Sequence, residues 1–256
     1  MTKKKDIIHQ NNFKDNNEGS LEMGKVIYLF NPIDPEMIWV EGGTFKMGAT
    51  SEQGNDYDYS EKPAHVVTLS GFMIGKYQVT QAHWKAIMGN DPSYYTGYNL
   101  PVECVSWNEV QDFIVKLNAQ TGKQYRLPTE TEWEFAARGG KKSKGYKYSG
   151  SNNPDEVAWY KKNITHPVGT KLSNELGIYD MSGNIFEWCS DWFDTYESNV
   201  QTNPQGPSLG SGRVIRGGAW CSNARNARVS YRSSWYPDYR RSDLGFRLAR
   251  SSNYVC

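Results

Sequence analysis

Apolar residues recur at helical spacing in three stretches of the chain, and each stretch is bounded by residues that start and stop helices. In two of them the start is an S/T-x-x-E capping box, in which the hydroxyl and the carboxylate satisfy reciprocal backbone donors. In the clearest stretch, residues 110, 113, 114 and 117 are apolar. The predicted helices run from an N-cap to a terminating glycine: Thr80 to Gly89, Ser106 to Gly122, and Thr129 to Gly139-Gly140.

Short apolar runs indicate β-strands on either side of these helices. Residues 37–40 and 44–48, joined by Glu41-Gly42-Gly43, are typical of a strand, a tight turn and a second strand. Residues 65–69 and 72–79 predict two more strands. After residue 140 the pattern indicates only short strands and long loops. The expected fold class is therefore α+β, with two or three helices on irregular short β-strands.

The two ends of the chain are predicted as tails, residues 1–34 and 251–256, around one domain over residues 35–250. The first tail is polar and lacks sustained periodicity, apart from Val26–Phe30, which indicates an added strand or, alternatively, a segment that docks a partner. Its lysines at positions 3–5 are not followed by an apolar core, so we expect no signal peptide, and no cysteine nearby could carry a lipid. No stretch approaches the roughly 18 apolar residues of a transmembrane helix, which leaves a cytoplasmic location as the default expectation.

The composition predicts an aromatic-rich interior and excludes several classes of function. The chain has 9 Trp, 17 Tyr, 9 Phe and 24 Gly, which indicates aromatic packing around many turns. Its net charge of +1 predicts no nucleic-acid partner, and it has no glycine-rich phosphate loop and no G-x-S-x-G nucleophile motif. Four cysteines lie far apart without zinc-ligand spacing, so we interpret them as free thiols: Cys104, Cys189, Cys221 and Cys256.

Four segments, in this order, carry a resemblance to a known family. They are WVEGGTFKMG (39–48), YRLPTETEWEFAARGG (125–140), GIYDMSGNIFEW (177–188) and RVIRGGAW…LGFRLAR (213–250). Together they resemble the formylglycine-generating enzyme (sulfatase-modifying factor) family over about residues 37–250. The resemblance implies a C-type-lectin-like fold, whereas function depends on the site residues.

The resemblance does not extend to the family's catalytic cysteines. In the founding enzyme, two cysteines five residues apart bind copper shortly after a Gly-Gly-Ser-aromatic turn, which here is Gly217–Trp220. The two cysteine positions fall on Ser222 and Ala227, and Cys221 lies one residue early without a partner. Serine and alanine cannot supply two thiolates for Cu(I), so we expect no copper and no formylglycine generation. The four histidines also lack the spacing of the three-histidine iron site found in a related branch.

The segment 177–188 implies a calcium site. In the family the matching turn holds a calcium ion, and the resemblance assigns Asp180 and Glu187 as carboxylate ligands, with backbone carbonyls from Gly183 and Ile185. Alternatively, Glu187 pairs with an arginine and Asp180 only caps the turn.

The C-terminal segment 216–250 is the predicted ligand-binding region. Its framework positions include Gly217, Gly218, Arg228, Gly245 and Phe246, and the clusters between them are made of residue types typical of binding loops. We expect the ligand-binding side chains to be Cys221, Ser222, Asn223, Ser233, Ser234, Trp235, Tyr236, Tyr239, Arg241, Ser242 and Asp243.

This pattern resembles the variable proteins of diversity-generating retroelements, some of which use the same fold and randomise adenine-containing codons near the C-terminus. Cys, Ser, Tyr, Arg and Asp all arise from an AAC asparagine codon when its adenines are replaced. The expected function is therefore non-catalytic binding of a protein or surface ligand through the C-terminal loops, with or without diversification. Neither nucleic-acid binding nor membrane insertion is expected. The alternative is an enzyme of the family with an altered active site.

Overall fold

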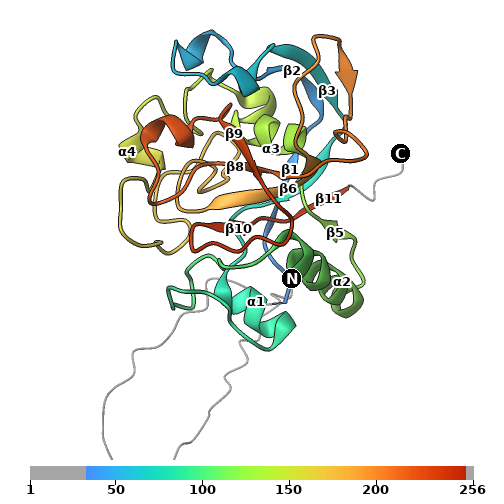
Figure 1. Cartoon of the computed structure of the whole chain (residues 1–256), viewed down its shortest axis with the longest axis vertical. Coiled ribbons are helices and arrows are strands. Elements are labelled where there is room, and N and C mark those ends of the chain that lie inside the picture. The colour runs from blue at the N-terminus through green and yellow to red at the C-terminus, as the bar shows by residue number, and fades with distance from the viewer. Residues whose placement is uncertain (1–32, 252–256) are drawn as a thin grey trace, which may run out of the picture.

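Three small β-sheets, with helices on their flanks, make up the fold in the computed structural model, which describes residues 33–251 (Figure 1). The α+β architecture expected from the sequence is confirmed, and no helix within the described range is long and apolar enough to cross a membrane. The predicted strand at Val26–Phe30 lies outside the described residues.

The first sheet joins the two ends of the domain. Its antiparallel order is β1 (Met37–Val40), β4 (Phe72–Gly75), β11 (Ala249–Ser251) and β5 (Tyr125–Arg126). Strand β4 pairs with β1 on one side and with β11 on the other, through Ile38 opposite Ile74 and Ile74 opposite Ala249. Residues next to both predicted domain boundaries make contacts with the domain. Asp34 accepts hydrogen bonds from Lys123 Nζ and Tyr125 Oη, and Ser251 pairs with Phe72.

The second sheet carries the C-terminal segment. Its order is β10 (Leu244–Phe246), β6 (Phe186–Trp192), β8 (Arg213–Arg216) and β9 (Arg232–Trp235). Strand β10 runs parallel to β6, with Gly245 opposite Glu187, whereas the other two pairs are antiparallel. A β-carbon on Gly245 would lie 2.1 Å from the Val102 carbonyl oxygen, so this close approach requires glycine.

The third sheet shows that the predicted hairpin between residues 37–40 and 44–48 is wrong. It consists of β2 (Gly43–Met47), β3 (His65–Leu69) and β7 (Gln201–Thr202). Both strands predicted within 37–48 exist, but β1 and β2 do not pair as a hairpin: β1 pairs with β4 and β2 pairs with β3. The chain crosses between sheets at Gly42, where a β-carbon would lie 2.5 Å from the Leu69 carbonyl oxygen.

The three predicted helices form with the predicted caps. They are α1 (Gln81–Met88), α2 (Trp107–Thr121) and α3 (Glu130–Ala137). The side chains of Thr80, Ser106 and Thr129 accept hydrogen bonds from the third helical backbone N–H, and Gly89 and Gly122 end α1 and α2 in the left-handed conformation. A fourth helix of four residues, α4 (Pro154–Val157), has no counterpart among the predictions.

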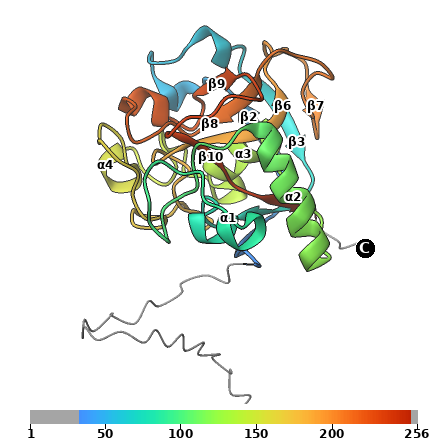
Figure 2. The ribbon, with the colours of Figure 1, turned by 60° about the horizontal axis from the view of Figure 1, so that its bottom comes forward.

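Aromatic side chains hold the helices against the sheets. Helices α1 and α2 pack together on one side of the domain (Figure 2), where the Trp84 and Phe113 rings stack with centres 5.2 Å apart. Helix α3 places Trp133 and Phe135 in a second cluster, between β2, β3, β6 and β8. The predicted binding residues lie after β8, on β9 and after β9, where exposed positions alternate with buried ones.

Candidate binding face of the C-terminal segment

Buried arginines of the C-terminal segment anchor its loops. Both Nη atoms of Arg228 donate to Glu61, at 2.8 and 2.6 Å, and both side chains are fully buried. Burial opposes ionisation of Glu61, but the Arg228 guanidinium, with other donors, holds its pKa below the usual value. Planar pairs of this kind fix side-chain geometry as well as charge.

Two further arginines of this segment converge on α3. Arg232 donates to both carboxylate oxygens of Glu130, at 2.7 and 2.6 Å, and Arg216 forms ion pairs with Glu134 and Glu130. The pKa of Glu130 is lowered by these two guanidinium groups although burial acts in the opposite direction. The framework positions Gly217, Gly218, Arg228, Gly245 and Phe246 are all buried, as the sequence analysis expects.

Three aromatic residues gather where β9 ends. The rings of Trp235 and Tyr239 are stacked, with centres 5.0 Å apart and planes 10° apart, and the ring centre of Tyr236 lies 6.5 Å from that of Tyr239. Trp235 is half-buried against the core, whereas Tyr236 and Tyr239 are 59% and 43% exposed. One side of the stack is thus anchored, and the other is open to solvent.

A charged pair extends this aromatic group toward the loop after β8. The guanidinium carbon of Arg241 lies 5.1 Å from the Trp235 ring centre, and Arg241 also donates to both carboxylate oxygens of Asp243, at 2.7 and 3.0 Å. The Cys221 thiol donates to Asp243 at 3.3 Å. Asp243 corrects one prediction from the sequence. It was expected to contact ligand, but its side chain is buried and binds Arg241 and Cys221.

The structure brings most of the predicted ligand-binding residues together, but not all. Ser233 and Ser234 are consecutive on β9, so their side chains point to opposite faces and cannot both belong to one surface. Ser222 Oγ accepts a hydrogen bond from the Ala219 backbone N–H at 3.2 Å, which ties this side chain to its own turn. Exposed predicted residues are Cys221, Asn223, Tyr236, Tyr239 and Arg241; half-buried ones are Ser222, Ser233, Ser234, Trp235 and Ser242.

Aromatic residues that are not among the predicted ligand-binding side chains border this surface. Trp220 donates its indole N–H to the Ser242 carbonyl at 3.1 Å, and its ring meets that of Tyr95 edge to face, with centres 5.5 Å apart. Tyr94, which is 73% exposed, lies against Tyr95. No role for this loop is predicted from the sequence, although its tyrosines at 94, 95 and 98 are a visible signal. We define the aromatic face as Tyr94, Tyr95, Trp220, Trp235, Tyr236, Tyr239 and Arg241.

The positions of the catalytic cysteines offer no thiol pair. Ala227 is buried at the end of a 3₁₀ turn (Ala224–Ala227), and Ser222 has a hydroxyl instead of a thiol. Burial, followed by the charge of Asp243, raises the pKa of the Cys221 thiol to about 11, and burial with a hydrogen bond to Glu103 raises that of Cys104 to about 12. Both side chains are therefore neutral thiols near pH 7 in the absence of a metal, and neither is an activated nucleophile.

Glu187, a predicted calcium ligand, is already paired. Arg247 donates to its two carboxylate oxygens at 2.6 and 2.7 Å, and the Trp133 indole N–H donates at 2.7 Å; all three side chains are fully buried. This arrangement is the alternative that the sequence leaves open, an ion pair between Glu187 and an arginine.

The Gln78 amide contacts two of the four groups that the resemblance assigns to calcium, the Glu187 carboxylate and the Ile185 carbonyl. Gln78 Nε2 lies 2.9 Å from Glu187 Oε1, 3.1 Å from the Ile185 carbonyl and 3.4 Å from the Asp180 carbonyl. Burial raises the pKa of Asp180 to about 6, and its carboxylate accepts from the Gly169 backbone N–H at 2.7 Å. Within residues 33–251, no group of three His, Cys, Asp or Glu side chains is placed to hold a metal ion. The donor set therefore does not fit a calcium ion at this turn.

Comparison with known proteins supports the scaffold. Residues 31–252 match the family described as "Sulfatase-modifying factor enzyme 1-like domain". The chain is 36% identical to "Chaperone protein LppX" of Paenibacillus barcinonensis, over 86% of this chain and 90% of that protein. It is 34% identical to the formylglycine-generating enzyme of Streptomyces coelicolor, over 68% of this chain and 60% of that enzyme.

Among solved structures, the fold is similar to "Treponema denticola variable protein 1". The TM-score is 0.77 at 33% identity, and the match covers 84% of this chain and 95% of that chain. The family match spans all of the described residues, and the resemblance seen in the four motifs is confirmed. The chain therefore belongs to the family of the sulfatase-modifying factor enzyme 1-like domain.

Proposed function

We propose that this domain is a non-catalytic binding module and that its ligand surface is the aromatic face. One observation carries the proposal: the Tyr236 and Tyr239 rings are exposed beside the half-buried Trp235, on loops anchored by buried arginine pairs. Exposed aromatic groups of this kind are typical of interaction sites, since rigid rings provide contact area at low entropic cost. The similarity to a variable protein supports this use of the scaffold.

The ligand is a protein or another surface ligand with apolar and hydrogen-bonding groups. The face combines aromatic rings with the phenol groups of Tyr236 and Tyr239 and the guanidinium of Arg241, which keeps one side of its plane toward Trp235. Such groups suit a mixed polar and apolar epitope, because aromatic and arginine side chains contribute most to binding energy at interfaces. Diversification of residues 216–250 by a retroelement belongs to the same proposal.

Capture of partners from the organism's own surface and culture fractions tests the binding proposal. The double variant Tyr236→Ala/Tyr239→Ala should lose at least about ten-fold in captured partner, since hot-spot truncations cost upward of 1–2 kcal/mol each. Tyr59→Ala is the matched control, because Tyr59 is 93% exposed but lies outside the aromatic face. Equal capture by both variants would contradict the proposal.

The DNA beside the gene tests diversification separately. A near-duplicate of codons 216–250, with adenines at the variable positions and a reverse transcriptase gene nearby, is the expected arrangement. Its absence would contradict diversification and would leave only the proposal that an invariant face binds ligand.

An enzyme with an altered active site is the second candidate, on the observation that Cys221 is exposed beside a buried carboxylate. We expect no formylglycine when the protein is incubated with copper, oxygen and a sulfatase-type peptide, because Ser222 and Ala227 provide no thiol. Conversion of the peptide cysteine that is lost in Cys221→Ser would favour this candidate instead.

A further inference from the structure

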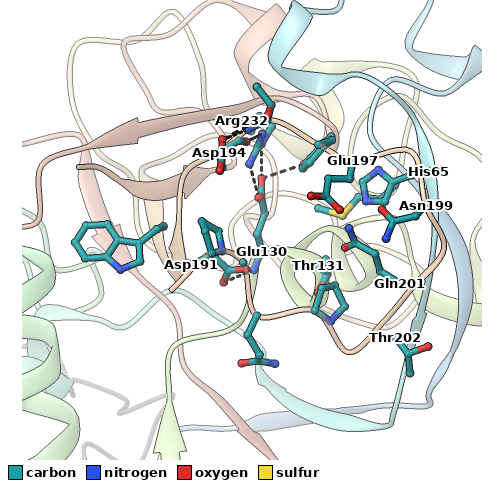
Figure 3. A pocket seen from close by; sticks show the side chains of 18 of the residues that line it. His65, Glu130, Thr131, Asp191, Asp194, Glu197, Asn199, Gln201, Thr202 and Arg232 are labelled. Atoms are coloured by element: carbon teal, nitrogen blue, oxygen red, sulfur yellow. Dashed lines mark hydrogen bonds and ion pairs between the residues drawn. The ribbon is translucent and has the colours of Figure 1, made fainter. Parts of the chain in front are cut away.

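A cavity of about 530 Å³, whose lining shares no residue with the aromatic face, opens beside α3 (Figure 3). Its walls come from the end of β2, the start of β3, the start of α3, the end of β6, the loop 193–207, which includes β7, and the start of β9. The volume lies within the range of small-molecule sites. Segments more than 100 residues apart in the sequence meet here.

The cavity has an excess of negative charge. Its lining includes the carboxylates of Glu130, Asp191, Asp194 and Glu197, and Arg232 is the only Lys or Arg among its residues. Arg232 forms an ion pair with Glu130 through two hydrogen bonds, so these two side chains together contribute no net charge. Within the part of the chain that the structure describes, the other three carboxylates form no ion pair with Lys or Arg.

Asp191 is the deepest of the three. It is 4% exposed, and its Oδ2 accepts hydrogen bonds from the Glu130 backbone N–H at 2.9 Å and from Ser190 Oγ at 2.8 Å. Burial, followed by the negative charge of Glu130, raises its pKa to about 7. A buried carboxyl group that ionises with difficulty is stabilised in its charged form when a cation enters beside it.

The other walls supply neutral hydrogen-bonding groups. Figure 3 shows the amide side chains of Asn199 and Gln201 across the cavity from Asp191, with Glu197 above them. Asp194 and Glu197 are exposed at the rim, whereas Asp191 lies inside. Carboxylates therefore lie at both the inner and the outer end of one open space, which favours an elongated cation over a compact one and repels anions.

We propose that this cavity binds a small organic cation with more than one ammonium group, of the linear polyamine class. One ammonium group would lie near the buried Asp191 and another at the rim, near Asp194 or Glu197, with the amide oxygens of Asn199 and Gln201 accepting further N–H bonds. This site is independent of the aromatic face and of the ligand proposed for it.

Titration calorimetry of the whole protein with spermidine tests this proposal. We expect saturable binding that weakens with added salt, because the ion pairs at the rim are screened. The double variant Asp194→Asn/Glu197→Gln should weaken it at least about five-fold, since two attractive charges are lost. Both residues are exposed and outside the buried ion pairs, so the variant should fold, which its melting temperature checks.

Two controls separate a site from general attraction between charges. Asp112→Asn removes one exposed carboxylate on α2, away from the cavity, and should change the affinity less than about two-fold. Triethylene glycol, a neutral chain of similar length, should not bind. Equal weakening by Asp112→Asn, equal binding of the neutral chain, or no saturable binding of spermidine would each overturn the proposal. Tyr236→Ala/Tyr239→Ala should leave spermidine binding unchanged, whatever the fate of the aromatic face.

Discussion

Burial distinguishes two neighbouring aromatic residues that look equivalent in the sequence. From the sequence alone, Trp235 and Tyr236 are both surface residues whose loss should leave stability almost unchanged. In the structure, Trp235 is half-buried, packs on the core and stacks on Tyr239, whereas Tyr236 is 59% exposed. Of these two residues, Tyr236 is therefore the one exposed to a partner, whereas Trp235 is anchored against the core.

The two substitutions should consequently differ in their effect on stability. We expect Trp235→Ala to lower the free energy of unfolding by about 2 kcal/mol, because it removes buried aromatic area and a stacking contact. Tyr236→Ala should change it by no more than about 0.5 kcal/mol. Urea denaturation followed by circular dichroism measures both. A similar, small effect of both variants would show that Trp235 is not anchored.

Asp191 provides a second prediction at the scale of one residue. Its pKa rises from 3.8 to about 7 on folding, mainly through burial. The stability that its bound proton provides is therefore fully present below the pKa of the unfolded chain, 3.8, and is lost as the pH rises through the folded pKa of about 7. Asp191→Asn keeps an oxygen acceptor for the Glu130 N–H and never ionises.

The variant should gain stability relative to the natural protein as the pH rises. The difference in unfolding free energy should grow by roughly 2 kcal/mol between about pH 5 and about pH 8, since one unit of pKa shift corresponds to about 1.4 kcal/mol. The charged neighbours of Asp191, namely Glu130, Glu132 and Arg213, are present in both proteins and do not produce the difference. Thermal melts across this pH range measure it, and a constant difference would contradict the raised pKa.

At the scale of elements, local signals predict the helices well and the strand partners poorly. The caps of α1, α2 and α3 lie within a few residues of the turns that they stabilise, so the sequence contains the whole interaction. Strand partners are distant: β2 pairs with β3, and β7 joins them from more than 130 residues away. A strand-turn-strand pattern specifies two strands but not which neighbours they take.

Gly245 in β10 tests how closely the elements approach. An added methyl group would lie 2.1 Å from the backbone oxygen of Val102 and 2.6 Å from the Ile185 side chain. We expect Gly245→Ala to cost more than about 3 kcal/mol or to prevent folding, because backbone cannot move aside as a side chain can. The yield of soluble protein and its melting temperature measure this effect.

Gly97→Ala is the matched control for this prediction. The new methyl group would meet only the flexible side chain of Leu100, at 3.0 Å, so the cost should be below about 1.5 kcal/mol. Equal behaviour of the two variants would show that β10 can shift away from the Val102 backbone.

At the scale of the whole molecule, buried ion pairs hold the C-terminal segment to the rest. Because Arg247 and Gln78 already bind the Glu187 carboxylate, we expect a chelator to leave the melting temperature unchanged. A fall in melting temperature with chelator, reversed by calcium, would restore the metal assignment.

Removing the charge of Glu187, unlike adding a chelator, should lower the stability of the protein. Glu187→Gln leaves Arg247 buried without a counter-charge, which should cost about 3 kcal/mol whether or not calcium is present. Glu132→Gln is a useful comparison, because its partner Arg126 is one-third exposed and can be solvated when the pair is broken.

The sequence was sufficient for the fold class, the three capped helices, the buried framework of the C-terminal segment and the family. Each of these depends on spacing within a short segment or on motifs in a given order, which are properties of the chain itself. Only the packed structure separates Ser233 from Ser234, buries Asp243, adds Tyr94 and Tyr95 to the aromatic face and encloses the acidic cavity. These features depend on which distant segments meet and on which atoms lose contact with water, and neither follows from residue types at local spacing.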